Sequence, residues 1–168
     1  MDRYYIEDFL ANHAQDIRGR VLEVADNSYT LKFGENRVTQ SDVLNLTEKP
    51  GASIVADLTR AEHLPSDTFD CIILTQTLHL LYDLPAALRT VHRILKPGGV
   101  VLLTVPGISP ICTDPGGKWT DFWRFTDASL TRLLQEVFPC ELVRVDVYGN
   151  VLSASAFLPG RDVYHGSI

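Results

Sequence analysis

The chain has 168 residues, of which 45% are hydrophobic and 21% charged, and its formal net charge is −6. This length suits one domain with a substantial core, and we expect residues 1–168 to form it. The negative charge argues against a nucleic-acid backbone or an anionic membrane surface as the main partner.

The first half of the chain starts with a helical pattern followed by three candidate strands. Residues at helical spacing predict an amphipathic first helix that Gly19 ends: Ile6, Phe9, Leu10, His13 and Ile17. Residues 21–25 form a short apolar run that predicts a buried parallel strand. Residues 37–42 and 53–56 are weaker strand candidates.

The next part alternates strand and helix patterns. Residues 71–75 and 100–105 are apolar and rich in β-branched side chains, which predicts two buried strands. Between them, Asp83 is placed to cap a helix with Pro85 in its first turn. The run Lys96-Pro97-Gly98-Gly99 ends this helix.

The last part predicts one more helix and one more strand. Thr126 is the expected N-cap of the helix, and Pro139 stops it. Residues 141–147 alternate between valine and charged residues, which predicts a half-exposed strand near a sheet edge. Residues 151–158 are small and apolar, and they fit either a returning strand or a short helix.

Strands that alternate with helices predict an α/β fold of three layers, with a mostly parallel sheet covered on both faces. Such sheets bind ligands at the carboxyl ends of their strands, near the point where the strand order reverses. Site residues are therefore expected just after Ala25, Asp42, Ala56 and Thr75.

Three carboxylates lie along successive strand–helix units of this predicted sheet. Glu23 lies in the first strand, Asp42 is expected to close the second, and Asp57 follows the third. An acid at the end of the second strand is the usual partner of ribose hydroxyls. Acids at strand ends are also common as caps and turn residues, but their order along the chain favours a nucleoside site.

At this point the sequence resembles the class I, Rossmann-like S-adenosylmethionine-dependent methyltransferases. The motifs that carry the resemblance are Asp57, Leu64-Pro65, Phe69-Asp70, Leu78-His79 and the run from Arg93 to Gly99. The stretches 21–43 and 121–126 further resemble a bacterial subgroup linked with glycan biosynthesis. The resemblance implies a sheet of six or seven strands, S-adenosylmethionine as cofactor and a methyl-transfer reaction.

The same resemblance implies which residues contact the cofactor. They are Glu23, Ala25, Asp26, Asn27, Asp42, Asp57, Leu58 and Thr75. No group of His, Cys and carboxylate residues has the spacing of metal ligands, so we expect no metal.

The chain departs from this family at its cofactor loop. The three loop glycines expected after the first strand are replaced by Ala25, Asn27 and Tyr29. Asn27 is the residue best able to keep a turn of positive φ, whereas the ring of Tyr29 needs space where a helix begins. Residues 28–36 and 43–52 are too short for full crossover helices, so we expect both to be trimmed.

His79, just past the fourth strand, is the expected general base for an oxygen acceptor. The alternative is that it is only a polar residue on the following helix. Residues 106–126 are the expected acceptor loop, with Trp119, Phe122, Trp123 and Phe125 suited to sugar rings and Arg124 suited to an anionic group. The alternative is that these aromatics cover the end of the sheet. Asp114 and Asp121 are further base candidates.

Two functions remain open. One is a methyltransferase acting on oxygen in a sugar, glycan or natural-product intermediate. The other is an inactive methyltransferase-like binding or scaffolding domain that partners a biosynthetic enzyme or a second copy of itself, since trimmed helices leave apolar faces to cover. Scattered cysteines and the lack of an apolar leader favour a cytoplasmic protein with reduced thiols.

Overall fold

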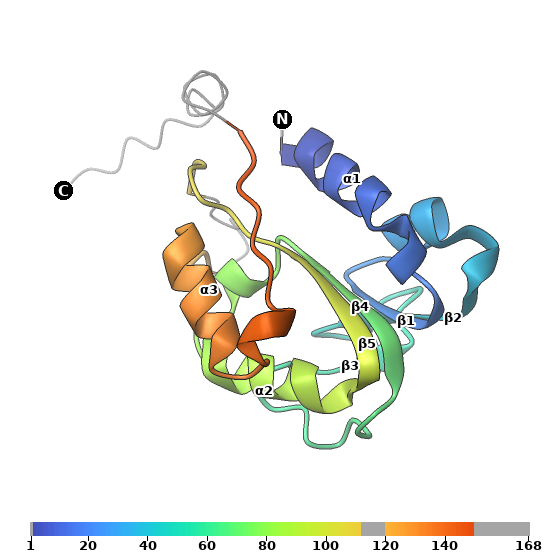
Figure 1. The fold of residues 1–168 in the computed structure, drawn as a ribbon. Coiled ribbons are helices and arrows are strands. Elements are labelled where there is room, and N and C mark those ends of the chain that lie inside the picture. The colour runs from blue at the N-terminus through green and yellow to red at the C-terminus, as the bar shows by residue number, and fades with distance from the viewer. Residues whose placement is uncertain (1, 112–119, 150–168) are drawn as a thin grey trace.

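The computed structural model describes residues 2–111 and 120–149 of the chain. They contain one parallel sheet in the order β3-β2-β1-β4-β5, with helices on both faces (Figure 1). The strands are β1 (Gly19–Val24), β2 (Val38–Asn45), β3 (Ile54–Val55), β4 (Phe69–Thr75) and β5 (Leu95–Thr104). The helices are α1 (Asp2–Asn12), α2 (Leu84–Ile94) and α3 (Asp127–Gln135). The predicted three-layer α/β class is confirmed.

The two faces of the sheet carry separate apolar clusters, because successive side chains of a strand point to opposite faces. Leu22 and Ile72 pack on the face that α2 covers, whereas Val21 and Ile73 pack on the face that α1 covers. Leu22, Val21 and Ile73 are each 0% exposed. Burial of one such side chain stabilises the fold by roughly 1.5–3 kcal/mol, so the central strands β1 and β4 anchor both layers.

Helix α2 begins and ends close to where the sequence predicts. The Asp83 side chain accepts a hydrogen bond from the backbone N of Ala86 at 3.0 Å, and a proline occupies the first turn. Strand β5 then starts directly at Leu95, earlier than expected. Its register against β4 shifts between Leu95 and Val100, so the intervening lysine, proline and two glycines form an irregularity within the strand.

The crossover connections are shortened, as predicted. Between β1 and β2 the helical residues are 28–37, and they include a π turn, Thr30–Gly34, and a 3₁₀ turn, Glu35–Arg37. Residues 46–53 between β2 and β3 contain no helix. The face of the sheet above the first connection is covered instead by α1, together with the rings of Tyr29 and Phe33.

The sheet has five strands within the described residues, so the expected sixth strand over residues 141–147 is wrong. Cys140–Leu142 is a 3₁₀ turn, and the following residues are extended without pairing to β5. The valine alternation favours an extended backbone, but a strand also needs a partner edge. Here the ring of Tyr148 packs against Tyr5 and Phe9 of α1. Residues 151–158 lie outside the described residues.

The terminal helices also refine the sequence prediction. Helix α1 ends at Asn12 rather than continuing to Ile17, which is nevertheless 0% exposed and packs below the helix. Helix α3 starts as predicted, because Thr126 and Ser129 form a reciprocal capping box. In residues 2–111 and 120–149, no helix has the length and apolar character to cross a membrane.

Candidate cofactor and acceptor site

The strand order reverses between β1 and β4. The chain runs outward from β1 through β2 to β3, and then returns to the other side of β1 as β4. In open parallel sheets ligands bind in the crevice at this reversal. Ala25 follows β1 and Gln76 follows β4, and both have left-handed backbones, with φ of 77° and 47°. Such conformations in non-glycine residues cluster at functional sites.

The loop after β1 keeps a glycine-like turn without a glycine. Ala25, and not Asn27 as expected, has the positive φ. The backbone N of Ala25 donates to the carbonyl of Leu44 at 2.9 Å, and Asn45 Nδ2 donates to the carbonyl of Ala25 at 3.1 Å. The amide of Asn27 instead donates to Ser41 Oγ at 3.1 Å. Asn45, which the sequence reading missed, is therefore the residue that holds this turn.

Glu23 holds the start of the segment that follows the loop. Its carboxylate accepts hydrogen bonds from the backbone N of Tyr29 at 3.2 Å, and from the backbone N and Oγ1 of Thr30 at 2.8 and 2.7 Å. Glu23 is 2% exposed, and this burial raises the pKa of its carboxyl group. Both oxygens are used within the protein, so Glu23 shapes the loop through its neighbours.

Tyr29 does not point into the crevice at the carboxyl edge. Its ring stacks on Phe33, with centroids 6.2 Å apart and planes at 25°, in the apolar cluster that α1 covers. The glycine-to-tyrosine replacement is therefore accommodated on one face of the sheet. The Tyr29 ring therefore does not fill the space beyond the end of β1, which adjoins Ala25.

Asp42 does not close β2 as expected. It pairs with Leu22 in the interior of the sheet, and the strand continues to Asn45. Its carboxylate accepts from Arg20 Nε at 2.7 Å and from Ser53 Oγ at 3.1 Å, and the residue is 5% exposed. The expected boundary was wrong because a polar run, residues 39–42, starts the strand and the apolar part follows it.

The remaining predicted cofactor residues lie at or beside strand ends. Asp57 follows β3, and its Oδ1 accepts from the backbone N and Oγ1 of Thr59 at 2.9 and 2.7 Å. The Leu58 side chain is buried in the core beneath α2. Asp26 is exposed and accepts from the backbone N of Ser28 at 2.8 Å. Thr75 ends β4 and is half-buried.

His79 lies in the short turn Leu78–Leu80 after β4 and is 8% exposed. Within the part of the chain that the structure describes, its Nδ1 has no hydrogen-bond partner. Burial lowers the pKa of His79, and the charge of Arg124 lowers it further, whereas Asp121 opposes this shift. The imidazole is therefore neutral at pH 7, the form that accepts a proton.

The loop that packs against His79 is held by an ion pair. Arg124 Nη1 and Nη2 lie 2.5 and 2.7 Å from the two carboxylate oxygens of Asp121, and Nη2 also donates to the carbonyl of Pro110 at 2.8 Å. The Asp121 side chain is 2% exposed. The expected roles of Arg124 as an anion ligand and of Asp121 as a base are therefore replaced by a structural one. Asp114 and Trp119 lie outside the described residues.

An exposed aromatic cluster adjoins this loop. Tyr82 lies 5.3 Å from Phe122 and 6.0 Å from Trp123, measured between ring centroids. Trp123 Nε1 donates to the carbonyl of Leu81 at 2.9 Å, and the backbone N of Phe122 donates to the carbonyl of His79 at 2.8 Å. Tyr82 is 72% exposed. The aromatic cluster thus connects to the His79 turn, and Tyr82 is a member that the sequence reading missed.

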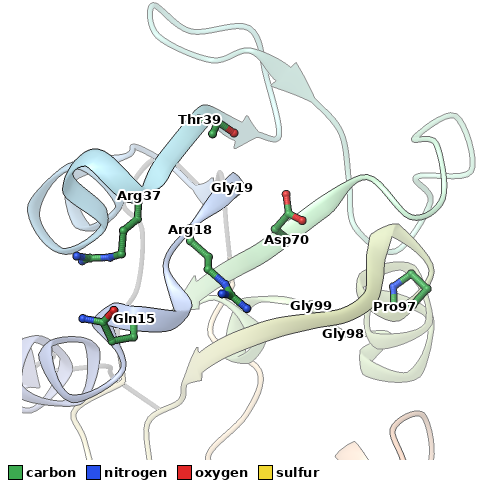
Figure 2. A pocket seen from close by; sticks show the side chains of 9 residues that line it. All are labelled: Gln15, Arg18, Gly19, Arg37, Thr39, Asp70, Pro97, Gly98 and Gly99. Carbon is green, nitrogen blue, oxygen red and sulfur yellow. The ribbon is translucent and has the colours of Figure 1, made fainter.

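A separate cleft of about 510 Å³ lies at the opposite, amino edge of the sheet (Figure 2). Its lining includes Gly19 before β1, Thr39 in β2, Asp70 in β4 and Gly98 in β5. None of the predicted cofactor residues lines it. The strand reversal, where open parallel sheets bind their ligands, lies at the other edge.

Comparison with known proteins identifies the family of this chain. Residues 8–103 match the family model of a methyltransferase domain. The chain belongs to this family. The resemblance to class I S-adenosylmethionine-dependent methyltransferases is confirmed, and with it S-adenosylmethionine as the cofactor of the family.

Curated relatives of this methyltransferase domain differ in their named activities. It is 31% identical over 122 residues to the ubiquinone/menaquinone biosynthesis C-methyltransferase UbiE of Haemophilus ducreyi, covering 70% of this chain and 44% of the relative. It is 35% identical over 89 residues to the human mitochondrial arginine-hydroxylase NDUFAF5, covering 51% of this chain and 25% of the relative. The chain thus spans less than half the length of these curated relatives.

The fold is also similar to that of solved methyltransferases. A SAM-dependent methyltransferase from Archaeoglobus fulgidus superposes with a TM-score of 0.61 at 13% identity, covering 92% of this chain and 83% of that one. At this identity the likeness concerns the fold alone, and function depends on the residues of the site.

Proposed function

We propose that this methyltransferase domain binds S-adenosylmethionine at the carboxyl edge and methylates an oxygen of a sugar, glycan or natural-product intermediate. The observation that supports this most is the turn at Ala25. It keeps the left-handed backbone of a glycine loop, and Asn45 holds it by a hydrogen bond to the Ala25 carbonyl. Left-handed backbones at non-glycine residues cluster at functional sites, so this turn supports a retained cofactor site.

The residues present fit the cofactor in an altered way. The backbone of Asp26 is offered to its amino-acid part, since the Ala25 backbone is engaged by Leu44 and Asn45 and its side chain adds only one methyl group at this edge. Asn45, at the end of β2, takes the ribose position in place of Asp42, which Arg20 engages. Asp57 and the backbone of Leu58 are placed after β3 for the adenine.

When bound, the cofactor supplies a methyl group on a positively charged sulfur. The protein's part is to place the acceptor in line with that group and to exclude water. For an oxygen acceptor, His79 Nδ1 would accept the proton of the hydroxyl group that is methylated. A buried neutral imidazole with an uncommitted nitrogen suits this task.

The exposed rings of Tyr82, Phe122 and Trp123 are the proposed acceptor platform. Aromatic faces bind the apolar faces of sugar rings as well as planar aromatic acceptors. The UbiE relatives are named as C-methyltransferases, so a carbon acceptor is the competing assignment. A base such as His79 would serve an oxygen acceptor and a carbon acceptor equally. Identifying the methylated atom of the product distinguishes the two reactions.

Calorimetry with S-adenosylmethionine and S-adenosylhomocysteine tests the cofactor assignment. We expect saturable one-to-one binding in the wild type and weaker binding in Ala25→Val, because a β-branched residue does not tolerate the positive φ. Ala128→Val, at an exposed position of α3, is the control and is expected to bind normally. The proposal would be overturned if the wild type gave no heat of binding and no thermal shift at millimolar ligand.

A second function rests on the connection between β2 and β3. Leu46 and Val55 are 60% and 43% exposed where residues 46–53 form no covering helix. This favours a binding or scaffolding domain whose apolar edge is covered by a second copy or by a partner enzyme. Mass measurement in solution tests it. A strict monomer with full cofactor affinity contradicts it, whereas a dimer that Leu46→Ser disrupts supports it.

A further inference from the structure

The cleft at the amino edge contains polar groups that neither the fold nor the proposed function uses. Arg18 and Gln15 come from the segment before β1, Arg37 ends the 3₁₀ turn before β2, and Thr39 lies at the start of β2 (Figure 2). These four side chains are hydrogen-bond donors, and they line one cleft with the irregular glycine turn of β5. The carboxyl edge of the sheet, where the cofactor is assigned, lies at the other end of the strands.

The guanidinium group of Arg37 is held in place, but one of its nitrogens has no hydrogen-bond partner among the described residues. Its Nη2 donates to the carbonyl of Phe33, and Nη1 lies 3.7 Å from Glu35, an exposed residue. Its Nε is buried and has no hydrogen-bond partner among the described residues. A buried donor without a partner costs ~1–3 kcal/mol, so such a group calls for a water molecule, an ion or a ligand as its partner.

Arg18 is the more accessible cation of the cleft. It is exposed, and no hydrogen bond of its guanidinium to a described residue exists, although its charge reaches Asp70. In Figure 2 its side chain extends into the space between Asp70 and the turn at Gly99. An arginine in this position presents a planar fork of donors that suits a phosphate or a carboxylate.

The carboxylate in the cleft is already neutralised. Asp70 Oδ2 accepts from Lys96 Nζ at 2.8 Å and from the backbone N of Arg20 at 2.8 Å. These two contacts, first the Lys96 hydrogen bond and then the backbone one, lower the pKa of Asp70. Because Lys96 balances Asp70, and because the exposed Glu35 lies 3.7 Å from Arg37, the cleft keeps a local positive excess that comes mainly from Arg18, in a chain of net charge −6.

We propose that this amino-edge cleft is a second ligand site, which binds the phosphate or carboxylate group of a small anionic molecule. Arg18 supplies the charge-assisted hydrogen bonds, Arg37 adds positive charge at the wall of the cleft, and Gln15 and Thr39 supply neutral donors. A volume of about 510 Å³ admits a molecule of metabolite size. The site is separate from the cofactor edge, so its occupancy does not depend on methyl transfer.

Titration calorimetry with inorganic phosphate, and in a second arm with acetate, tests this site at constant ionic strength. We expect saturable binding of the wild type to at least one of the two anions, and the better arm identifies the source as phosphate or carboxylate. Arg18→Gln is expected to weaken binding at least about tenfold, since a hydrogen bond to a charged group is lost. Arg89→Gln, at an exposed position of α2, is the matched control.

Arg37→Gln is a second variant and is expected to weaken binding similarly if the protein remains folded. Because Arg18 makes no hydrogen bond to the described residues, Arg18→Gln is expected to fold and to bind S-adenosylmethionine like the wild type, which separates this test from that of the proposed function. The proposal would be overturned if injections of phosphate and acetate gave the same heats as control injections of sodium chloride. It would also be overturned if Arg18→Gln left the affinity for the anion unchanged.

Discussion

The two edges of the sheet solve the same backbone problem with different residues. At the carboxyl edge, the left-handed positions are Ala25 and Gln76, although neither is a glycine. At the amino edge, Gly19 and Gly98 have φ of 66° and 78°. Two further left-handed residues, Glu35 before β2 and Asp67 before β4, are also not glycines, with φ of 50° and 49°. The amino edge thus uses glycines and other residues in this conformation, whereas the two turns beside the strand reversal use none.

The two edges of the sheet also differ in charge. The carboxyl edge holds a neutral, buried His79 and the exposed aromatic cluster, which suit an uncharged acceptor. The amino edge holds ion pairs and two arginines with unused donors. One protein therefore offers two chemically distinct surfaces at the ends of the same five strands.

Replacing the proposed base should have the largest effect. His79→Gln is expected to lower kcat by ~10²–10⁴-fold with little change in S-adenosylmethionine affinity, because only the proton transfer is lost. His63→Gln, at an exposed position, is the control. A variant that loses stability but keeps its kcat would show that His79 is only structural.

The pH dependence of His79 follows from its lowered pKa. Since burial disfavours the imidazolium, the base form persists below the ordinary histidine pKa, and wild-type activity should fall only at lower pH. The folded state also binds fewer protons there than the unfolded state, so the free energy of unfolding should decrease as the pH falls through the ordinary value. His79→Gln should remove this part of both profiles.

Gly19 tests how much the amino edge depends on glycine. A Cβ at this position would lie 2.5 Å from Asp70 Oδ2, and φ is 66°, so Gly19→Ala should destabilise the protein by ~2–4 kcal/mol. Gly98→Ala has the same backbone strain but no atom within 4 Å, and it should lose only ~1 kcal/mol. Urea denaturation measures both, and equal losses would remove the role assigned to the Asp70 contact.

At the carboxyl edge, exchanging alanine and glycine at position 25 should change the stability in the opposite direction. Ala25→Gly removes the penalty of a left-handed alanine and should stabilise the protein by ~0.5–1 kcal/mol. Ala128→Gly in α3 should destabilise it by up to ~1 kcal/mol, as glycine does within helices. Thermal unfolding of the two variants gives the comparison. Loss of stability in Ala25→Gly would mean that the turn at Ala25 carries no strain.

The smallest expected effect concerns charge at the amino edge. Asp70→Asn releases Lys96 from its ion pair and should tighten phosphate binding a few-fold, since one negative charge leaves the cleft. Asp67→Asn, at an exposed position outside the cleft, should leave the affinity unchanged. Calorimetry at fixed ionic strength measures both. Weaker phosphate binding in Asp70→Asn would argue that Asp70 positions the arginines.

Much of the site was predictable wherever a local pattern sufficed. The loop residues Ala25–Asn27, the acid Asp57 and the base candidate His79 were all found from strand ends and family motifs, and all lie at the carboxyl edge. Asn45 was missed because the end of β2 was expected at Asp42. Tyr82 was missed because its ring joins Phe122 and Trp123 from about forty positions along the chain.

The sequence by itself determined the alternation of strands and helices, the caps at Asp83 and Thr126, and the shortened crossovers. These depend on spacing, on capping side chains and on segment length, all of which are local. The tertiary structure alone decided that Tyr29 packs under α1, that Arg20 engages Asp42, and that residues 143–149 pair with no strand. Each of these depends on which distant residue meets a side chain or a strand edge, and local patterns carry no information about that partner.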